Sequence, residues 1–164
     1  MRRQLLEDDR GVSIAVSHVM AIAITAIVIS GLMFGASALL EGEKDRSAGQ
    51  SLETIGERLS GEISSVDRLA DDETGTLTVT VDHPRTVSGS SYTIDLEEKC
   101  STPLIKDDQS CLRLESHGGD VEVGVPVKTS NANVTDSSAT GGTIVIEYED
   151  EGDDGTISIE RDSR

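Results

Sequence analysis

Hydrophobic residues form one uninterrupted segment near the start of the chain. Residues 11–40 contain no Asp, Glu, Lys or Arg, and Arg10 and Glu41 flank this segment. At about 1.5 Å per residue, a helix over residues 12–40 is roughly 43 Å long. Since the hydrocarbon core of a bilayer is about 30 Å thick, such a helix is long enough to cross a membrane.

After Glu41 the pattern becomes amphipathic. Apolar residues recur at steps of three and four, the spacing that places side chains on one face of a helix. They are Leu52, Ile55, Leu59, Ile63, Val66 and Leu69. Charged and small polar residues lie between them, and no proline interrupts residues 12–68. The pattern therefore predicts one nearly continuous helix from Val12 to about Ala70, apolar on all sides at first and striped from residue 41 onward.

The period changes to two after the acidic turn at residues 71–75. Apolar residues that alternate with polar ones indicate strands with one buried face. We expect six strands, at residues 76–81, 92–97, 112–116, 121–127, 143–149 and 156–160. Asp154–Gly155 is predicted to form the turn of the last hairpin, and Pro126 places the fourth strand at a sheet edge or a bulge.

These elements predict an α+β fold. A long N-terminal helix precedes a small antiparallel β-sheet domain of about six strands, a sandwich or half-barrel that packs on the striped face of the helix. The segment at residues 129–142 is predicted to be a loop. It contains Asn133-Val134-Thr135, an N-glycosylation sequon, so Asn133 is a candidate glycosylation site.

The charge of the chain is strongly one-sided. The net charge is −17. The three arginines and three acidic residues of positions 1–10 offset one another, so the excess lies in residues 41–164. Such a domain repels nucleic acid and anionic lipid surfaces. The acidic composition resembles that of proteins from salt-adapted microbes, where molar salt screens charges to about 3 Å; the alternative is a disordered acidic tail.

The two cysteines, Cys100 and Cys111, both lie beyond the apolar segment. An even pair in this position favours a disulfide in an oxidising exterior. Closing this loop would stabilise the fold by roughly 2–3 kcal/mol. Free buried thiols are the alternative. Structural zinc takes four ligands, and the spacing of His83 and His117 to the cysteines matches no zinc motif, so we expect no metal site.

Three hypotheses account for the N-terminal segment. A secretory signal peptide would have its cleavage site at Ala36-Ser37-Ala38, although its apolar core is usually about 7–15 residues long. A twin-arginine signal is suggested by Arg2-Arg3, although acidic residues separate that pair from the apolar segment. In a type IV prepilin leader, the peptidase cuts before the apolar segment and leaves it on the mature protein.

The junction Arg10-Gly11-Val12-Ser13 resembles that of archaeal type IV pilins, and of haloarchaeal pilins in particular. The resemblance covers about residues 2–40. It implies that Gly11 ends a class III signal peptide and that a prepilin peptidase makes Val12 the first mature residue. Ile14 stands where many haloarchaeal pilins have proline, and Val16 stands where bacterial type IV pilins have glutamate.

The resemblance and the residue pattern together predict four segments. The resemblance implies a leader over 1–11 and a transmembrane or filament-core helix over 12–40. The residue pattern adds the amphipathic continuation over 41–70 and a β-domain over 71–164, which the resemblance would place outside the cell. The implied partners are the membrane, the peptidase and other pilin-like subunits packed through the helix, at the cell membrane or in a surface filament. The alternative is an uncleaved, single-pass, membrane-anchored binding or envelope-associated module; a third hypothesis is a secreted domain cut after Ala38.

Glycines mark a candidate packing face on the helix. Gly31 and Gly35 form a G-x-x-x-G pair, a pattern that lets helices approach closely in lipid. Gly35, Gly42, Gly49 and Gly56 are seven residues apart, and such a column drifts only about 20° per repeat. We expect these positions to form a groove for a neighbouring helix; chance, or a flexible joint near residues 41–49, is the alternative. His18, the only ionisable residue of the segment, is expected near the lipid headgroups.

No catalytic grouping is recognisable in the sequence. The chain has no G-x-S-x-G, P-loop, H-E-x-x-H or C-x-x-C motif. Acidic residues crowd the last hairpin, but their order does not match a calcium-binding loop. They are Glu147, Glu149, Asp150, Glu151, Asp153 and Asp154. We therefore expect a solvated acidic turn there, and a protein without cofactor, metal or catalytic residues that is not an enzyme and binds no nucleic acid.

Overall fold

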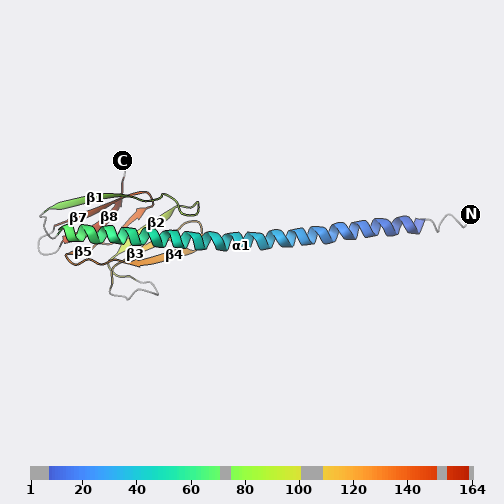
Figure 1. Cartoon of the computed structure of the whole chain (residues 1–164), viewed down its shortest axis with the longest axis horizontal. Helices are drawn as coiled ribbons and strands as arrows, with labels where there is room; N and C mark the ends of the chain where they lie inside the picture. Colours follow the sequence, from blue (N-terminus) through green and yellow to red (C-terminus); the bar gives the residue numbers. More distant parts are fainter. Residues whose placement is uncertain (1–7, 71–74, 101–108, 151–154, 163–164) are drawn as a thin grey trace, which may run out of the picture. The chain divides into compact units, whose positions relative to one another are not determined.

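The computed structural model describes residues 8–70, 75–100, 109–150 and 155–162 (Figure 1). The chain forms two compact units, Met1–Glu43 and Lys44–Arg164. Helix α1, Asp8–Ala70, is 63 residues long and contributes to both units. The continuous helix predicted up to about Ala70 is therefore confirmed.

The second unit contains eight strands in the described part of the chain. They are β1 (Thr76–Asp82), β2 (Tyr92–Glu97), β3 (Cys111–Ser116), β4 (Val121–Pro126), β5 (Ala132–Val134), β6 (Ser137–Thr140), β7 (Thr143–Glu149) and β8 (Gly155–Arg161). They form two four-stranded sheets, in the orders β1-β7-β8-β5 and β4-β3-β2-β6. All neighbouring strands are antiparallel except β5 and β8, which are parallel. The predicted α+β fold, a long helix followed by a small sandwich-like β-domain, is confirmed.

Strands β5 and β6 correct the prediction of six strands and of a loop at residues 129–142. β5 has three residues and β6 has four. Alternation over so few residues cannot be distinguished from a polar loop, so the sequence pattern does not reveal them. The last hairpin, β7–β8, is antiparallel as predicted; the predicted turn residue Asp154 lies outside the described residues.

The striped face of α1 forms one side of the hydrophobic core. Leu52, Leu59 and Ile63 are fully buried and pack with the inward-facing residues of both sheets. In the view of Figure 1, β1 and β7 of one sheet lie above this part of α1, and β3 and β4 of the other sheet lie below it. Leu69 departs from the prediction, since it is 57% exposed. Its position lies about 120° around the helix from Ile63, and Ala70 is buried in its place.

Hydroxyl groups of α1 attach the helix to the chain that follows β4. Ser60 Oγ donates a hydrogen bond to the carbonyl oxygen of Pro126 at 2.8 Å. One turn further along, Ser64 Oγ donates to the carbonyl oxygen of Lys128 at 2.9 Å. β4 is the end strand of its sheet, which confirms the edge position that Pro126 predicts.

Asp67 joins the end of α1 to the start of β5. Its carboxylate is 2% exposed and accepts hydrogen bonds from three consecutive backbone N–H groups, those of Ser130, Asn131 and Ala132, at 2.8–3.0 Å. Asn131 Nδ2 also donates to the Asp67 carbonyl oxygen at 3.1 Å. A carboxylate hydrogen-bonded in this way can remain buried, because its charge is met by aligned donors.

Candidate membrane-anchoring and assembly surface

Between Ile14 and Leu40, α1 exposes every large apolar side chain that it carries. Those side chains are between 52% and 83% exposed. They are Ile14, Val16, Val19, Met20, Ile22, Ile24, Ile27, Val28, Ile29, Leu32, Met33, Phe34, Leu39 and Leu40. This part of the helix is long and apolar enough to cross a membrane. An apolar surface of this extent is typical of a membrane or protein interaction site.

Hydroxyl side chains within this surface are hydrogen-bonded to the helix itself. Thr25 Oγ1 donates to the Ala21 carbonyl at 2.8 Å, and Ser30 Oγ donates to the Ala26 carbonyl at 2.8 Å. Ser37 Oγ donates to Met33 in the same way at 3.0 Å. Each hydroxyl thus has its donor satisfied four residues back along the chain. This arrangement suits lipid, where water is not present to pair with polar groups.

The five glycines predicted to form a packing face divide into two groups. A methyl group at Gly31, Gly35 or Gly42 would meet nothing within 4 Å among the described residues. These three positions are therefore open to a neighbouring helix.

Gly49 and Gly56 instead face strand β4 of their own domain. A methyl group at Gly49 would lie 3.6 Å from Val121, and one at Gly56 would lie 2.7 Å from Val125 Cγ2 and 2.9 Å from Leu114 Cδ1. The expected groove for a neighbouring helix is therefore corrected at these two positions. The reason is that the β-domain takes the space itself, and Gly56 is needed so that helix and sheet can approach this closely.

The predicted cleavage junction lies in the first turns of α1. Gly11 and Val12 have helical backbone, and the helix begins three residues before Gly11, at Asp8. Residues 1–7 of the expected leader lie outside the described residues. Cleavage between Gly11 and Val12 thus stays a prediction.

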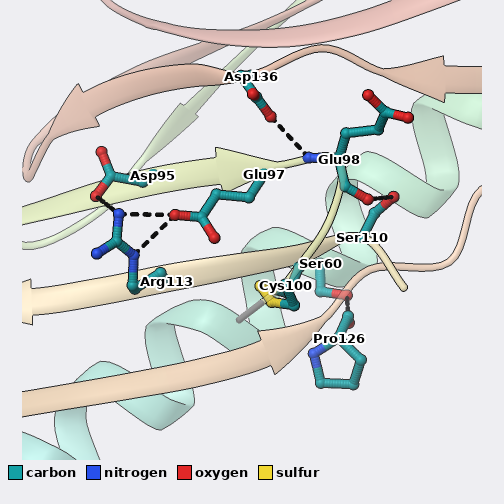
Figure 2. Close-up of a disulfide and its surroundings, with 10 residues drawn as sticks. Ser60, Asp95, Glu97, Glu98, Cys100, Ser110, Arg113, Pro126 and Asp136 are labelled. Atoms are coloured by element: carbon teal, nitrogen blue, oxygen red, sulfur yellow. Dashed lines mark hydrogen bonds and ion pairs between the residues drawn. A yellow bond between two sulfur atoms is a disulfide. The ribbon is translucent and has the colours of Figure 1, made fainter. Parts of the chain in front are cut away.

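The predicted disulfide between Cys100 and Cys111 is confirmed. The two Cα atoms are 5.7 Å apart, and both residues are buried. Cys111 begins β3, and Cys100 follows the end of β2, with which β3 pairs (Figure 2). Glu97 lies close to both sulfur atoms. Because the thiolates are consumed in the disulfide, this group of three residues is not a metal site.

A polar hollow lies beside the disulfide, on the outer side of β2, β3 and β6. It is open to solvent and has a volume of about 740 Å³. Arg113 contacts two carboxylates there, Asp95 at 3.3 Å and Glu97 at 2.7 Å (Figure 2). At its other end, Asp136 accepts a hydrogen bond from the backbone N–H of Glu98 at 2.8 Å. The charged groups therefore pair with one another, which is typical of a stabilised sheet surface.

The remaining candidate side chains lie apart from one another. His117 is exposed, and its ring nitrogens contact the Ser91 and Thr93 hydroxyls at 3.1 and 2.8 Å. His83 is buried after β1. Asn133 is exposed, but it lies in β5 and not in a loop, which corrects its predicted setting. Its strand is at the end of its sheet, so the side chain remains accessible.

The acidic residues of the last hairpin are only partly described. Glu149 and Asp150 are exposed and Glu147 is half-buried. Glu151, Asp153 and Asp154 lie outside the described residues. The solvated acidic turn expected there thus stays a prediction.

Asp67 is the residue that sequence reasoning missed. In the helical pattern it is one of several charged residues between apolar positions, and nothing in the sequence distinguishes it from exposed neighbours such as Arg68. Its role depends on three N–H groups that are more than sixty residues away in the sequence.

Comparison with known proteins gives one match. The model of a family of unknown function (DUF7266) matches residues 7–160, which covers α1, strands β1 to β7 and all of β8 except its last residue. No curated protein and no solved structure matches the chain.

Proposed function

We propose that this chain, which belongs to the DUF7266 family of unknown function, is a pilin-like subunit that is anchored in the cell membrane by its first helix and assembles through it. The observation that carries the proposal is the change of surroundings along α1. Its large apolar side chains are exposed from Ile14 to Leu40, whereas its apolar stripe from Ala48 onward is buried in the β-domain. One helix therefore joins a surface suited to lipid with a folded polar domain.

Assembly through the helix is supported by the three open glycines, Gly31, Gly35 and Gly42. Between helices in lipid, association depends on close packing, which small residues permit. The resemblance of residues 10–13 to archaeal pilins adds the expected route: a prepilin peptidase cuts between Gly11 and Val12, and the released helix exchanges lipid contacts for helix contacts in a filament. In this proposal the chain has a structural role and is the substrate of a peptidase, not an enzyme.

An extracellular β-domain is part of the proposal. The buried disulfide supports it, because disulfides persist in oxidising surroundings. The acidic surface agrees with it, since the net charge of −17 belongs to residues beyond the apolar segment and is screened in concentrated salt.

Intact-mass analysis of the chain from native membrane and filament fractions tests the proposal. We expect a mature chain that begins at Val12. A chain that retains residues 2–11 would refute leader cleavage, and the protein would then be a membrane-anchored domain. A chain that begins at Leu39 would refute leader cleavage and also the proposal that the apolar helix anchors the mature protein. Gly11→Ile is the matched variant: it changes the last leader residue and is expected to keep residues 1–11.

Assembly is tested by cross-linking the chain in membranes. Gly35→Leu places a large side chain on the open glycine face and is expected to reduce cross-linked oligomers, because neighbouring helices can no longer approach there. Phe34→Leu, at the next position, keeps the surface apolar and is the control. Equal cross-linking of both variants would refute packing at this face.

A further inference from the structure

His83 is a buried titratable residue whose side chain is not fully paired. It follows β1 and is 7% exposed. Its backbone N–H donates to the Gly142 carbonyl at 3.1 Å, which holds the residue in place. Its Nε2 atom, however, has no hydrogen-bond partner among the described residues. Buried polar side-chain atoms without a partner are uncommon in folded proteins, so this one requires an explanation.

Charged groups from two elements influence the pKa of the His83 imidazole. Arg58 and Glu62, one turn apart on α1, and Asp82, the last residue of β1, act on it. Burial lowers the pKa of His83 from 6.5, and Arg58 lowers it further, while Glu62 and Asp82 oppose the change. The folded protein therefore holds a neutral imidazole where α1 approaches the end of β1.

We propose that His83 makes the packing of α1 on the β-domain sensitive to acid. Protonation adds a positive charge to a buried ring whose Nε2 atom has no hydrogen-bond partner in the described part of the chain. The positive charge of Arg58 already disfavours this protonation. A buried charge without a paired partner is costly, so the charged form requires water to reach the ring. Acid then loosens the contact between α1 near residues 58–62 and the end of β1. This inference concerns only the second unit and is independent of the proposed assembly.

The direction of the pH dependence follows from the lowered pKa. The unfolded chain binds a proton at His83 as the pH falls through 6.5, before the folded protein does. The contribution of neutral His83 to the stability of the folded state is therefore present above pH 6.5 and decreases as the pH drops below it. A single histidine that stays neutral in the folded protein lowers the folded-to-unfolded ratio by up to about tenfold between pH 7.5 and 5.5.

Urea unfolding of the full chain in neutral detergent, at constant salt, measures this change. The chain has no Trp, and both tyrosines are buried in the β-domain, so tyrosine fluorescence reports on that domain. We expect the ratio in the native chain to fall by several-fold, up to about tenfold, from pH 7.5 to 5.5. His83→Phe replaces the imidazole by an apolar ring, and we expect it to remove most of this fall. If His83→Phe does not fold, His83→Gln makes the same test, because glutamine does not titrate.

His117→Gln is the matched control, because it removes an exposed histidine and leaves every carboxylate in place. It is expected to keep the full pH dependence of the native chain. Hydrogen exchange, corrected for intrinsic rates, adds a local readout: residues 58–62 are expected to exchange faster at pH 5.5 in the native chain but not in His83→Phe. The proposal would be overturned if the folded-to-unfolded ratio fell equally between pH 7.5 and 5.5 in His83→Phe and in the native chain. It would also be overturned if His117→Gln abolished the fall in this ratio.

Discussion

At Gly56, α1 and the β-domain approach each other closely, and a single methyl group tests this contact. In Gly56→Ala the new Cβ would lie 2.7 Å from Val125 Cγ2, 2.9 Å from Leu114 Cδ1 and 3.3 Å from Val125 Cβ. The Leu114 methyl can rotate away. Val125 cannot do so easily, because rotation about χ1 is restricted in its β-branched side chain and its backbone lies in a paired strand.

Two opposing effects set the size of the change. Alanine is more favourable than glycine in a helix interior by about 1 kcal/mol. Overpacking a well-filled core by one methyl group costs about 1–3 kcal/mol. Gly56→Ala is therefore expected to lower the free energy of unfolding by about 0–2 kcal/mol.

Gly61 supplies the matched control, since it also lies within α1 and a methyl group there would meet nothing within 4 Å among the described residues. Gly61→Ala gains only the higher helix propensity of alanine, and is expected to stabilise the protein by up to about 1 kcal/mol. The difference between the two variants then isolates the packing cost, about 1–3 kcal/mol. Urea unfolding of the full chain in detergent, followed by tyrosine fluorescence, measures both.

The double variant Gly56→Ala, Val125→Ala adds an independent check. Removing the Val125 methyl groups opens space for the new Cβ, so the two substitutions should be coupled and the double variant more stable than the sum of the single changes. Equal stabilisation of the protein by Gly56→Ala and Gly61→Ala would refute the conclusion that α1 and β4 are in close contact at Gly56.

Three further predictions concern the β-domain. Asp67→Asn leaves part of the three backbone N–H groups that donate to Asp67 without an acceptor, and is expected to lower the free energy of unfolding by about 2–4 kcal/mol in the same urea assay. Asp136→Asn is the control: the carboxylate of Asp136 is exposed, and its replacement is expected to change the free energy of unfolding by less than about 1 kcal/mol. Replacing Cys100 and Cys111 by Ser is expected to lower the melting temperature and to cost roughly 2–3 kcal/mol, and a reductant should then have no further effect. Burial raises the pKa of Tyr92 to about 12, so the folded state keeps this proton above pH 10 and its stability is lost between about pH 10 and 12. In an absorbance titration of tyrosinate, Tyr92→Phe should remove the ionisation step near pH 12. Persistence of that step in the variant would contradict its assignment to Tyr92.

The long helix and most strands could be predicted because their patterns are local and long. The steps of three and four from Leu52 to Val66 continue over several turns, and the alternation in β1 and β7 extends over seven residues each. The disulfide could be predicted because the chain has only two cysteines.

The features that the sequence did not reveal depend on contacts between distant residues. Asp67 is distinguished only by backbone donors at residues 130–132, and Gly56 only by Val125 and Leu114, which the fold brings beneath it. The same glycine spacing predicts an intermolecular groove from the sequence alone. A helix face does not tell whether its partner is another chain or the chain's own sheet, so that question required the structure.

The division of α1 explains why one helix can serve two surroundings. Fourteen large apolar side chains between Ile14 and Leu40 are exposed, and twelve of them are Ile, Val, Leu or Phe. Each of these twelve favours membrane insertion by about 0.3–0.6 kcal/mol near the helix centre, so together they contribute on the order of 4–7 kcal/mol. The apolar stripe from Ala48 to Ala70 is not available to contact lipid, because both sheets already cover it. The boundary between the compact units follows Glu43, at the first charges beyond the apolar segment. The β-domain can therefore fold on its half of the helix whether the other half contacts lipid or neighbouring helices, as the proposed exchange of lipid for helix contacts would require.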